Sequence, residues 1–288
     1  MDEIKIKAFA KINLGLEVLY KRADGYHEIN TVFTLTDLCD NLTISLAEGL
    51  SAECYPALEI NPKDNLVIKA AKLLQKKYDA VSYGAKITIY KNIPIGAGLG
   101  GGSSDAAAAL VGLCRLWNIK YDISDLLEIA GQIGSDVPYF IRIYLDELSR
   151  KQSAVASGRG EILNYFDYHL NMPYLLIYPN IHVSTVLAYK SLKKDSRIII
   201  GTDMLRIIME EPVEHWKNYL VNDFEKSVFK DYPVIGEIKS KLYETGAEFA
   251  MLSGSGSCIY GIFKDIESLN KTKNLFENYR TITGNISY

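Results

Sequence analysis

Residues 93–108 read IPIGAGLGGGSSDAAA, and this stretch decides what kind of fold the 288-residue chain adopts. Five glycines within 96–102 allow positive φ angles and a close approach of the backbone to a ligand. They lead through Ser103 and Ser104 into an alanine-rich segment that predicts a helix over 105–117. The amide groups at the start of a helix lack partners and, together with the helix dipole, favour an anion. The stretch therefore predicts a phosphate-binding loop.

Two other interpretations of this loop are weaker. If the segment were only a flexible loop capped by serine, nothing would offset the conformational entropy that its five glycines lose on folding. Gly96, Gly98 and Gly101 also spell GxGxxG, the dinucleotide-binding pattern. No clear βαβ unit precedes it, however, and no acidic residue ends a strand about 20 residues later. The pattern GxxxxGK[ST] is absent, because no lysine follows the last glycine. A nest for a polyphosphate is the favoured interpretation.

The composition is that of a globular protein that binds phosphate only locally. Hydrophobic residues make up 48% of the chain and charged residues 23%. The net charge of -3 and the pI near 5.9 give no basic field for nucleic acid or anionic lipid. We find no secretory-signal pattern and no apolar run near the roughly 20 residues that cross a bilayer. We therefore expect a cytoplasmic protein that binds neither nucleic acid nor membranes.

The cysteines and histidines indicate neither disulfides nor a zinc site. Cys39, Cys54, Cys114 and Cys258 form no CxxC pair, and the four histidines are scattered. Free thiols in a reducing compartment explain this pattern best.

Apolar periodicity along the rest of the chain alternates between strand and helix spacing. Strands are predicted over 4–6, 8–19, 31–35, 42–46, 85–90, 174–178, 250–252 and 258–263. Helices are predicted over 65–77, 105–117, 124–133, 184–191, 204–210, 235–245 and 266–279, with Asp64 and Ser124 as N-caps. The pattern is that of an α/β protein. A polar stretch at 146–152 indicates a division into two halves near 150–165.

Four further segments combine polar side chains with glycine or aromatic residues. Lys11 and Asn13 flank an isoleucine in AKINL and so share one face of a strand. DGYHE follows at 24–28, GSDVPYF at 134–140 and LSGSGS at 252–257. Taken alone, these segments would be a solvated strand face, an exposed hairpin, a capping turn and a small-residue hairpin turn.

In this order, the motifs resemble those of the GHMP kinase superfamily, which includes galactokinase, homoserine kinase and mevalonate kinase. The resemblance extends from Ala10 to about Phe263. It implies a two-domain fold, with a domain like the second domain of ribosomal protein S5 over 1–155 and a ferredoxin-like domain over 156–288. It also implies ATP and Mg²⁺ as cofactors. The implied ATP-binding residues are Pro94, Gly96, Ala97, Gly98, Leu99, Gly100, Gly101, Gly102, Ser103, Ser104, Asn65 and Leu66.

The resemblance also implies Lys11 and Asp136 as catalytic residues. Asp136 would accept the proton of a substrate hydroxyl or orient it, while Lys11 offsets charge near the reacting oxygens. A protein promotes phosphoryl transfer mainly by positioning the reactants and by stabilising the developing charge electrostatically. Ser103, Ser104 and Asp136 are the candidates for holding Mg²⁺, and the choice between them is open.

The DGYHE segment resembles that of one branch of the superfamily, whose members phosphorylate a cytidyl-linked methylerythritol. A tyrosine ring offers a stacking face, and an imidazole offers a donor and an acceptor to a pyrimidine edge. The implied substrate-binding residues are Asn13, Tyr26, His27, Phe33 and Tyr189.

Two alternatives stay open. One is a GHMP kinase for homoserine, a sugar or mevalonate, against which Tyr26 and His27 argue. The other is a non-catalytic nucleotide-binding protein of the same fold, against which Lys11 and Asp136 argue. The stretch 141–152 departs from the family pattern, because it is several residues longer than usual and lacks glycine.

Overall fold

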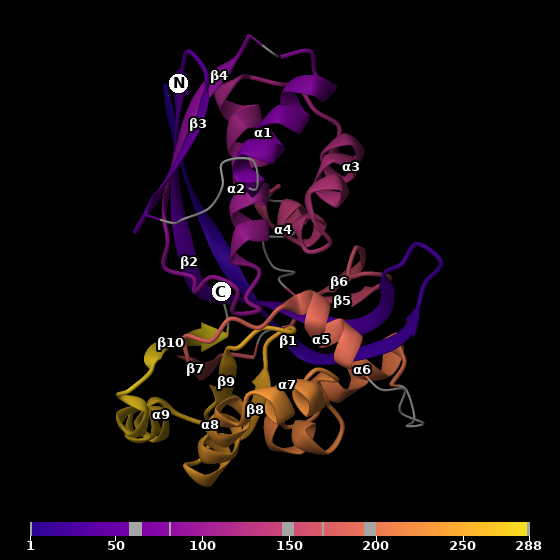
Figure 1. The fold of residues 1–288 in the computed structure, drawn as a ribbon, viewed down its shortest axis with the longest axis vertical. Coiled ribbons are helices and arrows are strands. Elements are labelled where there is room, and N and C mark those ends of the chain that lie inside the picture. The colour runs from indigo at the N-terminus through magenta and orange to yellow at the C-terminus, as the bar shows by residue number, and fades with distance from the viewer. Residues whose placement is uncertain are drawn as a thin grey trace. The chain divides into compact units, whose positions relative to one another are not determined.

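The computed structural model describes residues 2–57, 65–80, 82–145, 153–168, 170–192 and 200–286 (Figure 1). The chain divides into two compact units. The first comprises Met1–Ala10, Leu38–Ile95 and Gly100–Lys151, and the second comprises Lys11–Asp37, Gly96–Leu99 and Gln152–Tyr288. The polar stretch at 146–152 lies outside the described residues, and the domain division near 155 stays a prediction.

The described residues form mixed helices and strands. The strands are β1 (Glu3–Lys21), β2 (His27–Ala47), β3 (Leu50–Tyr55), β4 (Gly84–Tyr90), β5 (Ser153–Ser157), β6 (Ile162–Phe166), β7 (Met172–Tyr178), β8 (Phe249–Leu252), β9 (Ile259–Ile262) and β10 (Arg280–Ile286). The α-helices are α1 (Leu66–Lys77), α2 (Gly101–Leu116), α3 (Ile123–Ile133), α4 (Val137–Tyr144), α5 (Thr185–Ser191), α6 (Thr202–Glu210), α7 (Glu225–Asp231), α8 (Pro233–Glu244) and α9 (Ile266–Lys273). Two 3₁₀ turns, η2 (Val213–Asn218) and η3 (Asn274–Phe276), complete them.

The first unit packs helices α1 to α4 against a sheet. The C-terminal half of β2 pairs antiparallel with β4, and β4 pairs parallel with β3. Helix α2 is buried along almost its whole length, because its alanines at 106–109 have no side-chain bulk to hold it away from its neighbours. A Cβ at Gly112 would lie 2.5 Å from Cδ1 of Ile44. This close packing holds α2, the helix that begins at the end of the glycine loop, against the sheet.

The second unit is built on a four-stranded antiparallel sheet in the order β10-β7-β9-β8. Its strands β7, β8 and β9 are almost continuously apolar. Leu175, Ile177 and Ile259 from the sheet share one hydrophobic cluster with Ile238 of α8 and Leu269 of α9. In the same unit, the N-terminal half of β2 pairs with β5, and β5 pairs with β6. The β5–β6 hairpin thereby lies beside the strand that follows the DGYHE motif.

Most of the predicted elements are present, but several boundaries were wrong. The strands predicted over 4–6 and 8–19 are the single strand β1, and those over 31–35 and 42–46 are parts of β2. Helix α2 begins at Gly101, four residues before the predicted start, because Gly100 takes a left-handed φ of 69° and acts as its N-cap. The last predicted helix ends at Lys273, and β10 follows it.

Two caps also differ from the prediction. Asn65 caps α1 by accepting a hydrogen bond from Val67 N, while Asp64 lies outside the described residues. Helix α3 has Asp122 as its N-cap residue, so Ser124 lies inside the helix. The short elements β3, α4, β5, β6, α7 and β10 were not predicted from periodicity.

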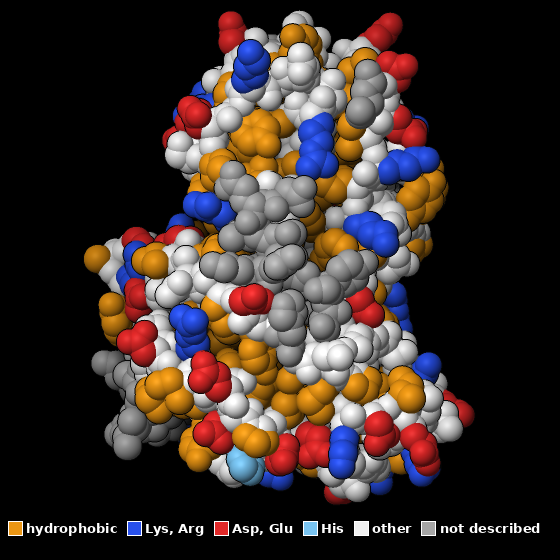
Figure 2. Space-filling view, turned by 180° about the vertical axis from the view of Figure 1, so that it is seen from behind, with side chains coloured by type: hydrophobic (Ala, Val, Ile, Leu, Met, Phe, Trp, Pro, Cys, Tyr) orange, Lys and Arg blue, Asp and Glu red, His pale blue; other side chains and the backbone are white. Residues whose placement is uncertain are grey.

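Charges of both signs are interspersed on the face shown in Figure 2, and the described part of that face carries no continuous basic area. None of the described helices is long and apolar enough to cross a membrane. The described cysteines Cys39, Cys54, Cys114 and Cys258 are free thiols, as expected.

Candidate active site

The glycine loop combines left-handed turns with the start of a helix. Gly96, Gly98 and Gly100 have φ values of 66°, 81° and 69°, which side chains rarely adopt. Helix α2 starts directly after Gly100, and no side chain caps it. Its first amide groups can therefore point at a ligand, as the sequence predicted. Pro94, Ala97 and Leu99 are buried and anchor the loop.

Within the second unit, the loop interlocks with the small-residue turn at 253–257. A Cβ at Gly98 would lie 1.8 Å from the carbonyl oxygen of Ser253, and one at Gly256 would lie 2.2 Å from Gly98 N. Ser253 Oγ donates to the carbonyl of Gly98 at 2.9 Å, and Lys11 N donates to the carbonyl of Leu99 at 3.0 Å. Two glycine turns therefore pack backbone to backbone next to the strand that carries Lys11.

Asn222 supports this turn, and sequence reasoning missed it. Its side-chain amide donates to the carbonyls of Leu252 and Gly254, each at 2.8 Å, and it is buried. Phe224 N donates in turn to Asn222 Oδ1 at 3.0 Å. Asn222 lies in an irregular segment without a motif, so the sequence offered no signal for it.

Lys11 is held in a defined position although it is only 4% exposed. Its Nζ donates to Oδ1 of Asn13 at 2.7 Å and lies 4.9 Å from the centroid of the Phe33 ring. Asn13 Nδ2 donates to Thr31 Oγ1 at 2.9 Å, which fixes the amide with its oxygen toward the lysine. The predicted pair Lys11 and Asn13 thus forms one buried polar unit on β1.

Asp136 belongs to the first unit, as the N-cap residue of α4. A Cβ at Gly134, in the same turn, would lie 3.9 Å from Ser103 Oγ on the first turn of α2. The structure therefore brings the GSDVPYF turn next to Ser103, which connects two of the sequence-predicted segments.

The two serines of the loop have different surroundings. Ser104 is buried, and its hydroxyl shares a 2.7 Å hydrogen bond with the hydroxyl of Tyr144. That hydroxyl also accepts from Phe9 N at 2.9 Å, and burial raises the pKa of Tyr144. Ser103 is half-buried instead. Of the two, Ser103 has the hydroxyl better placed for an external ligand.

Asn65 and Leu66 open helix α1, close to the glycine loop. A Cβ at Gly102, which is exposed on α2, would lie 3.5 Å from Cδ1 of Leu66. Asn65 receives the hydrogen bond of Val67 N at 3.0 Å. The structure thus brings these two residues and the loop's helix together within the first unit.

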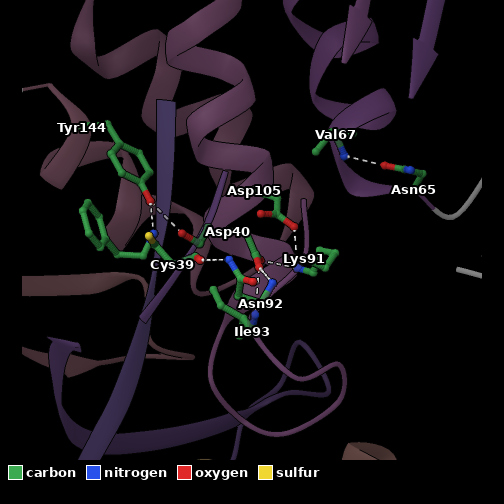
Figure 3. A network of polar contacts seen from close by, with 11 residues as sticks. Cys39, Asp40, Asn65, Val67, Lys91, Asn92, Ile93, Asp105 and Tyr144 are labelled. Atoms are coloured by element: carbon green, nitrogen blue, oxygen red, sulfur yellow. Dashed lines mark hydrogen bonds and ion pairs between the residues drawn. The ribbon is translucent and has the colours of Figure 1, made fainter. Parts of the chain in front are cut away.

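A buried triad of charges joins the two ends of the loop in the first unit (Figure 3). Lys91 Nζ, at the end of β4, donates to Oδ2 of Asp40 and, at 2.8 Å, to Oδ2 of Asp105 on α2. Oδ1 of Asp40 accepts from the backbone N–H groups of Asn92 and, at 2.8 Å, Ile93. Burial raises the pKa of Asp105 to about 7, and its Oδ1 has no hydrogen-bond partner among the described residues. No sequence motif indicates the triad, because its members come from three separate segments of the chain.

The predicted base-binding residues lie in the second unit. The rings of His27 and Tyr189 stack with their centroids 4.8 Å apart, and Tyr189 meets Phe224 edge-to-face at 4.8 Å. Burial, together with the charge of Lys21, lowers the pKa of His27, so its imidazole stays neutral at neutral pH. Phe33 is 2% exposed and lies under Lys11, away from solvent.

Tyr26 differs from its neighbour, because its ring is 53% exposed. The guanidinium of Arg159 lies over this ring, 4.6 Å from the centroid. A pyrimidine could therefore meet an aromatic face, a neutral imidazole and a cation in this part of the unit. Sequence reasoning identified the first two and missed the cation.

No group of three or more His, Cys, Asp or Glu side chains among the described residues could hold a metal by itself. A metal ion at this site would need ligands from a substrate or nucleotide as well. That arrangement is usual for Mg²⁺, which keeps several waters and binds phosphate oxygens.

Comparison with known proteins places the chain in a family. Residues 65–142 match the model of the GHMP kinases N terminal domain, and residues 207–278 match that of the GHMP kinases C terminal domain. A protein of Chlorobium phaeobacteroides named 4-diphosphocytidyl-2-C-methyl-D-erythritol kinase is 40% identical over 97% of this chain and 96% of its own length. A protein of the same name from Azobacteroides pseudotrichonymphae is 44% identical over 88% of this chain and 91% of its own length.

Solved structures agree with these matches. The crystal structure of a 4-(cytidine 5'-diphospho)-2C-methyl-D-erythritol kinase matches with a TM-score of 0.77 and 29% identity, over 99% of this chain and 100% of that one. Homoserine kinase from Cytophaga hutchinsonii shares the fold, with a TM-score of 0.73 at 16% identity over 100% of this chain and 96% of that one. The resemblance and the α/β fold class drawn from the sequence are thereby confirmed. The chain belongs to the GHMP kinases and, within them, to the family of the 4-diphosphocytidyl-2-C-methyl-D-erythritol kinases.

Proposed function

We propose that the chain transfers the γ-phosphoryl group of ATP to the 2-hydroxyl of 4-diphosphocytidyl-2-C-methyl-D-erythritol, giving ADP and the 2-phosphate. This reaction belongs to the non-mevalonate route to isoprenoid precursors. The observation that carries the proposal is the interlocked pair of glycine turns at 96–100 and 253–257, packed beside Lys11. The names of relatives at about 40% identity give the substrate.

The glycine loop suits a triphosphate for two physical reasons. Any side chain at Gly98 or Gly256 would clash with the opposing backbone, so the two turns come closer together than other residues would allow. The uncapped start of α2 adds amide donors and the positive end of a helix dipole. These groups would hold the phosphate chain, while Asn65 and Leu66 border the adenine.

Lys11 and Asp136 would act on the reacting hydroxyl. Lys11 carries a positive charge that is fixed by Asn13 and poorly screened by water, because both side chains are buried. Such a charge stabilises the negative charge that develops during phosphoryl transfer. Asp136, at the start of α4, would accept the proton of the hydroxyl or orient it.

When bound, Mg²⁺ would neutralise part of the negative charge of the ATP phosphates. Ser103 and Asp136 are the protein groups that fit this ion best, because Ser104 already hydrogen-bonds Tyr144. Both are oxygen donors, which hard divalent cations prefer.

A coupled assay of ADP release tests the proposal. The purified protein is offered ATP and Mg²⁺ with the cytidyl substrate, homoserine, mevalonate or galactose in parallel. We expect turnover with the cytidyl substrate alone and a large loss of kcat in Asp136→Asn with the KM for ATP little changed. Turnover of another alcohol would favour a different GHMP kinase. ATP binding without turnover of any alcohol would favour a non-catalytic protein.

A further inference from the structure

Arg159 is placed over the tyrosine of the DGYHE motif. It lies in the turn between β5 and β6, and its guanidinium carbon is 4.6 Å from the centroid of the Tyr26 ring. Its side chain is 26% exposed, and Nε faces Oε1 of Glu161 at a long 3.4 Å. The pair is therefore partly open to a ligand.

The turn that carries Arg159 is firmly attached to the strand beside Tyr26. Gly158 N donates to Oε1 of Glu28 at 2.8 Å, and Ile29 N donates to the carbonyl of Gly158 at 2.8 Å. Arg159 N donates to Oε2 of Glu161 at 2.5 Å. These bonds join the β5–β6 turn to the start of β2, so the backbone of Arg159 keeps its place relative to the aromatic residues.

Arg159 and its neighbour Arg22 have different charge environments. Arg22 pairs with Asp24 at 3.1 Å and with Glu28 at 2.7 Å, so its charge is neutralised within its own loop. Among the described residues, the ion pair of Arg159 is one long contact from Nε to Glu161, while its charge also helps to lower the pKa of the nearby Asp24. A guanidinium that stacks on a ring keeps its N–H groups in its own plane, where they can still bind oxygen atoms at the edge. Arg159 is thus a cation beside the exposed Tyr26 whose N–H groups can still donate hydrogen bonds.

We propose that Arg159 binds the diphosphate group of the cytidyl substrate while its plane stays on the ring of Tyr26. The inference rests on the proposed function and on the prediction from the sequence that Tyr26, His27 and Tyr189 bind the cytosine. A diphosphate joins the cytidine to the methylerythritol, so it passes near whatever holds the base. Paired oxygens of a phosphate match the fork of an arginine, which makes such contacts stronger than neutral hydrogen bonds.

Calorimetric titration with cytidine, CMP and CDP tests the proposal, because these ligands share the base and differ in phosphate. We expect Arg159→Gln to weaken CDP binding about tenfold, equal to about 1.4 kcal/mol, and to leave cytidine binding within about twofold. Arg159→Lys should recover part of the CDP affinity through its charge. Arg206→Gln is the matched control, because Arg206 also lies over a ring, that of Phe166, outside the proposed site.

The possible outcomes distinguish an error about the role of Arg159 from an error about the substrate. An equal loss for all three ligands would mean that Arg159 only orients Tyr26, and it would overturn the diphosphate role. Unchanged CDP binding in Arg159→Gln would overturn it too. If the native protein binds ATP but none of the three cytidine compounds, the proposed substrate itself is wrong and the inference falls with it.

Discussion

The imidazole of His27 lies on the ring of Tyr189, with centroids 4.8 Å apart and planes inclined by 19°. The two residues are far apart in the sequence, one at the start of β2 and the other on α5. Phe224 meets Tyr189 edge-to-face, with centroids 4.8 Å apart. The stack therefore fixes the orientation of the imidazole ring and, with it, the direction of the two ring nitrogens.

The first prediction concerns the base. His27→Ala removes both the stacking partner of Tyr189 and the polar edge for a pyrimidine. We expect the KM for the cytidyl substrate to rise at least tenfold, because a buried hydrogen bond and an aromatic contact each contribute about 1 kcal/mol. The KM for ATP should change by less than twofold. Steady-state kinetics with each substrate varied in turn measures both, and an unchanged KM for the cytidyl substrate would refute the base-binding role.

The second prediction is a pH dependence. Burial and Lys21 hold the pKa of His27 below its ordinary 6.5, so the folded protein takes up this proton at lower pH than the unfolded chain does. We expect the KM for the cytidyl substrate to stay flat from pH 8 down past 6.5 and to rise only below that. The free energy of unfolding should also fall as the pH drops through 6.5, since the unfolded chain binds the proton first. His27→Gln should show neither change, and a KM that rises already between pH 8 and 7 would contradict the assignment.

The third prediction concerns Lys11. Lys11→Met keeps much of the volume and the aliphatic stem but removes the charge that Asn13 orients. We expect kcat to fall by about 10²- to 10³-fold, the usual cost of losing one preorganised electrostatic group at a reacting centre. Binding of ADP, measured by calorimetry, should persist. A kcat within threefold of native, in protein with an unchanged melting temperature, would exclude a direct role for the lysine.

The fourth prediction concerns the interlocked glycines. Gly98→Ala places a methyl 1.8 Å from the carbonyl oxygen of Ser253 at a φ of 81°, so the loop and the turn at 253–257 must move apart. We expect a lower melting temperature and a loss of ATP affinity of tenfold or more. Gly131→Ala is the control, because it lies inside α3 with nothing within 4 Å and should be neutral or stabilising by about 0.5–1 kcal/mol. Equal ATP affinity in the two variants would show that the close contact does not shape the nucleotide site.

The fifth prediction concerns stability and Asp105. Burial raises the pKa of Asp105 from 3.8 to about 7, so between these values the folded protein holds a proton that the unfolded chain has lost. The free energy of unfolding therefore decreases as the pH rises through this window. Asp105→Asn cannot ionise and should remove that decrease. At pH 8 we expect it to be more stable than the native protein by about 1–3 kcal/mol, because it carries no buried charge at a carboxyl whose Oδ1 lacks a hydrogen-bond partner among the described residues.

Urea unfolding at pH 5, 6, 7 and 8 measures this difference. Asp125→Asn serves as the control, because Lys77 lowers the pKa of Asp125 and its contribution to stability is lost as the pH falls instead. If Asp105→Asn retains the full decrease between pH 5 and 8, Asp105 does not titrate in this window.

The sequence by itself determined the elements whose signal is local. The glycine loop at 96–102 and the helix after it follow from the conformational freedom of glycine and the periodicity of alanine. The order of AKINL, DGYHE, GSDVPYF and LSGSGS identified the family. Short elements such as α4 and β10 were missed, because eight or fewer residues carry too little periodicity. The start of α2 was predicted too late in the chain, because glycine, which occupies its first positions, is more typical of loops than of helices.

Only the tertiary structure decided which distant residues meet. The contact of Gly98 with Ser253, the support from Asn222, the triad of Asp40, Lys91 and Asp105, and the cation over Tyr26 each join segments that are separate in the sequence. The triad and the hydrogen bonds of Asn222 also depend on burial, which sets how strongly charges and hydrogen bonds act. A motif fixes the chemistry that a residue can offer. Its partners are set by the packing of the whole chain, because contact distances arise only once the strands and helices have been brought together.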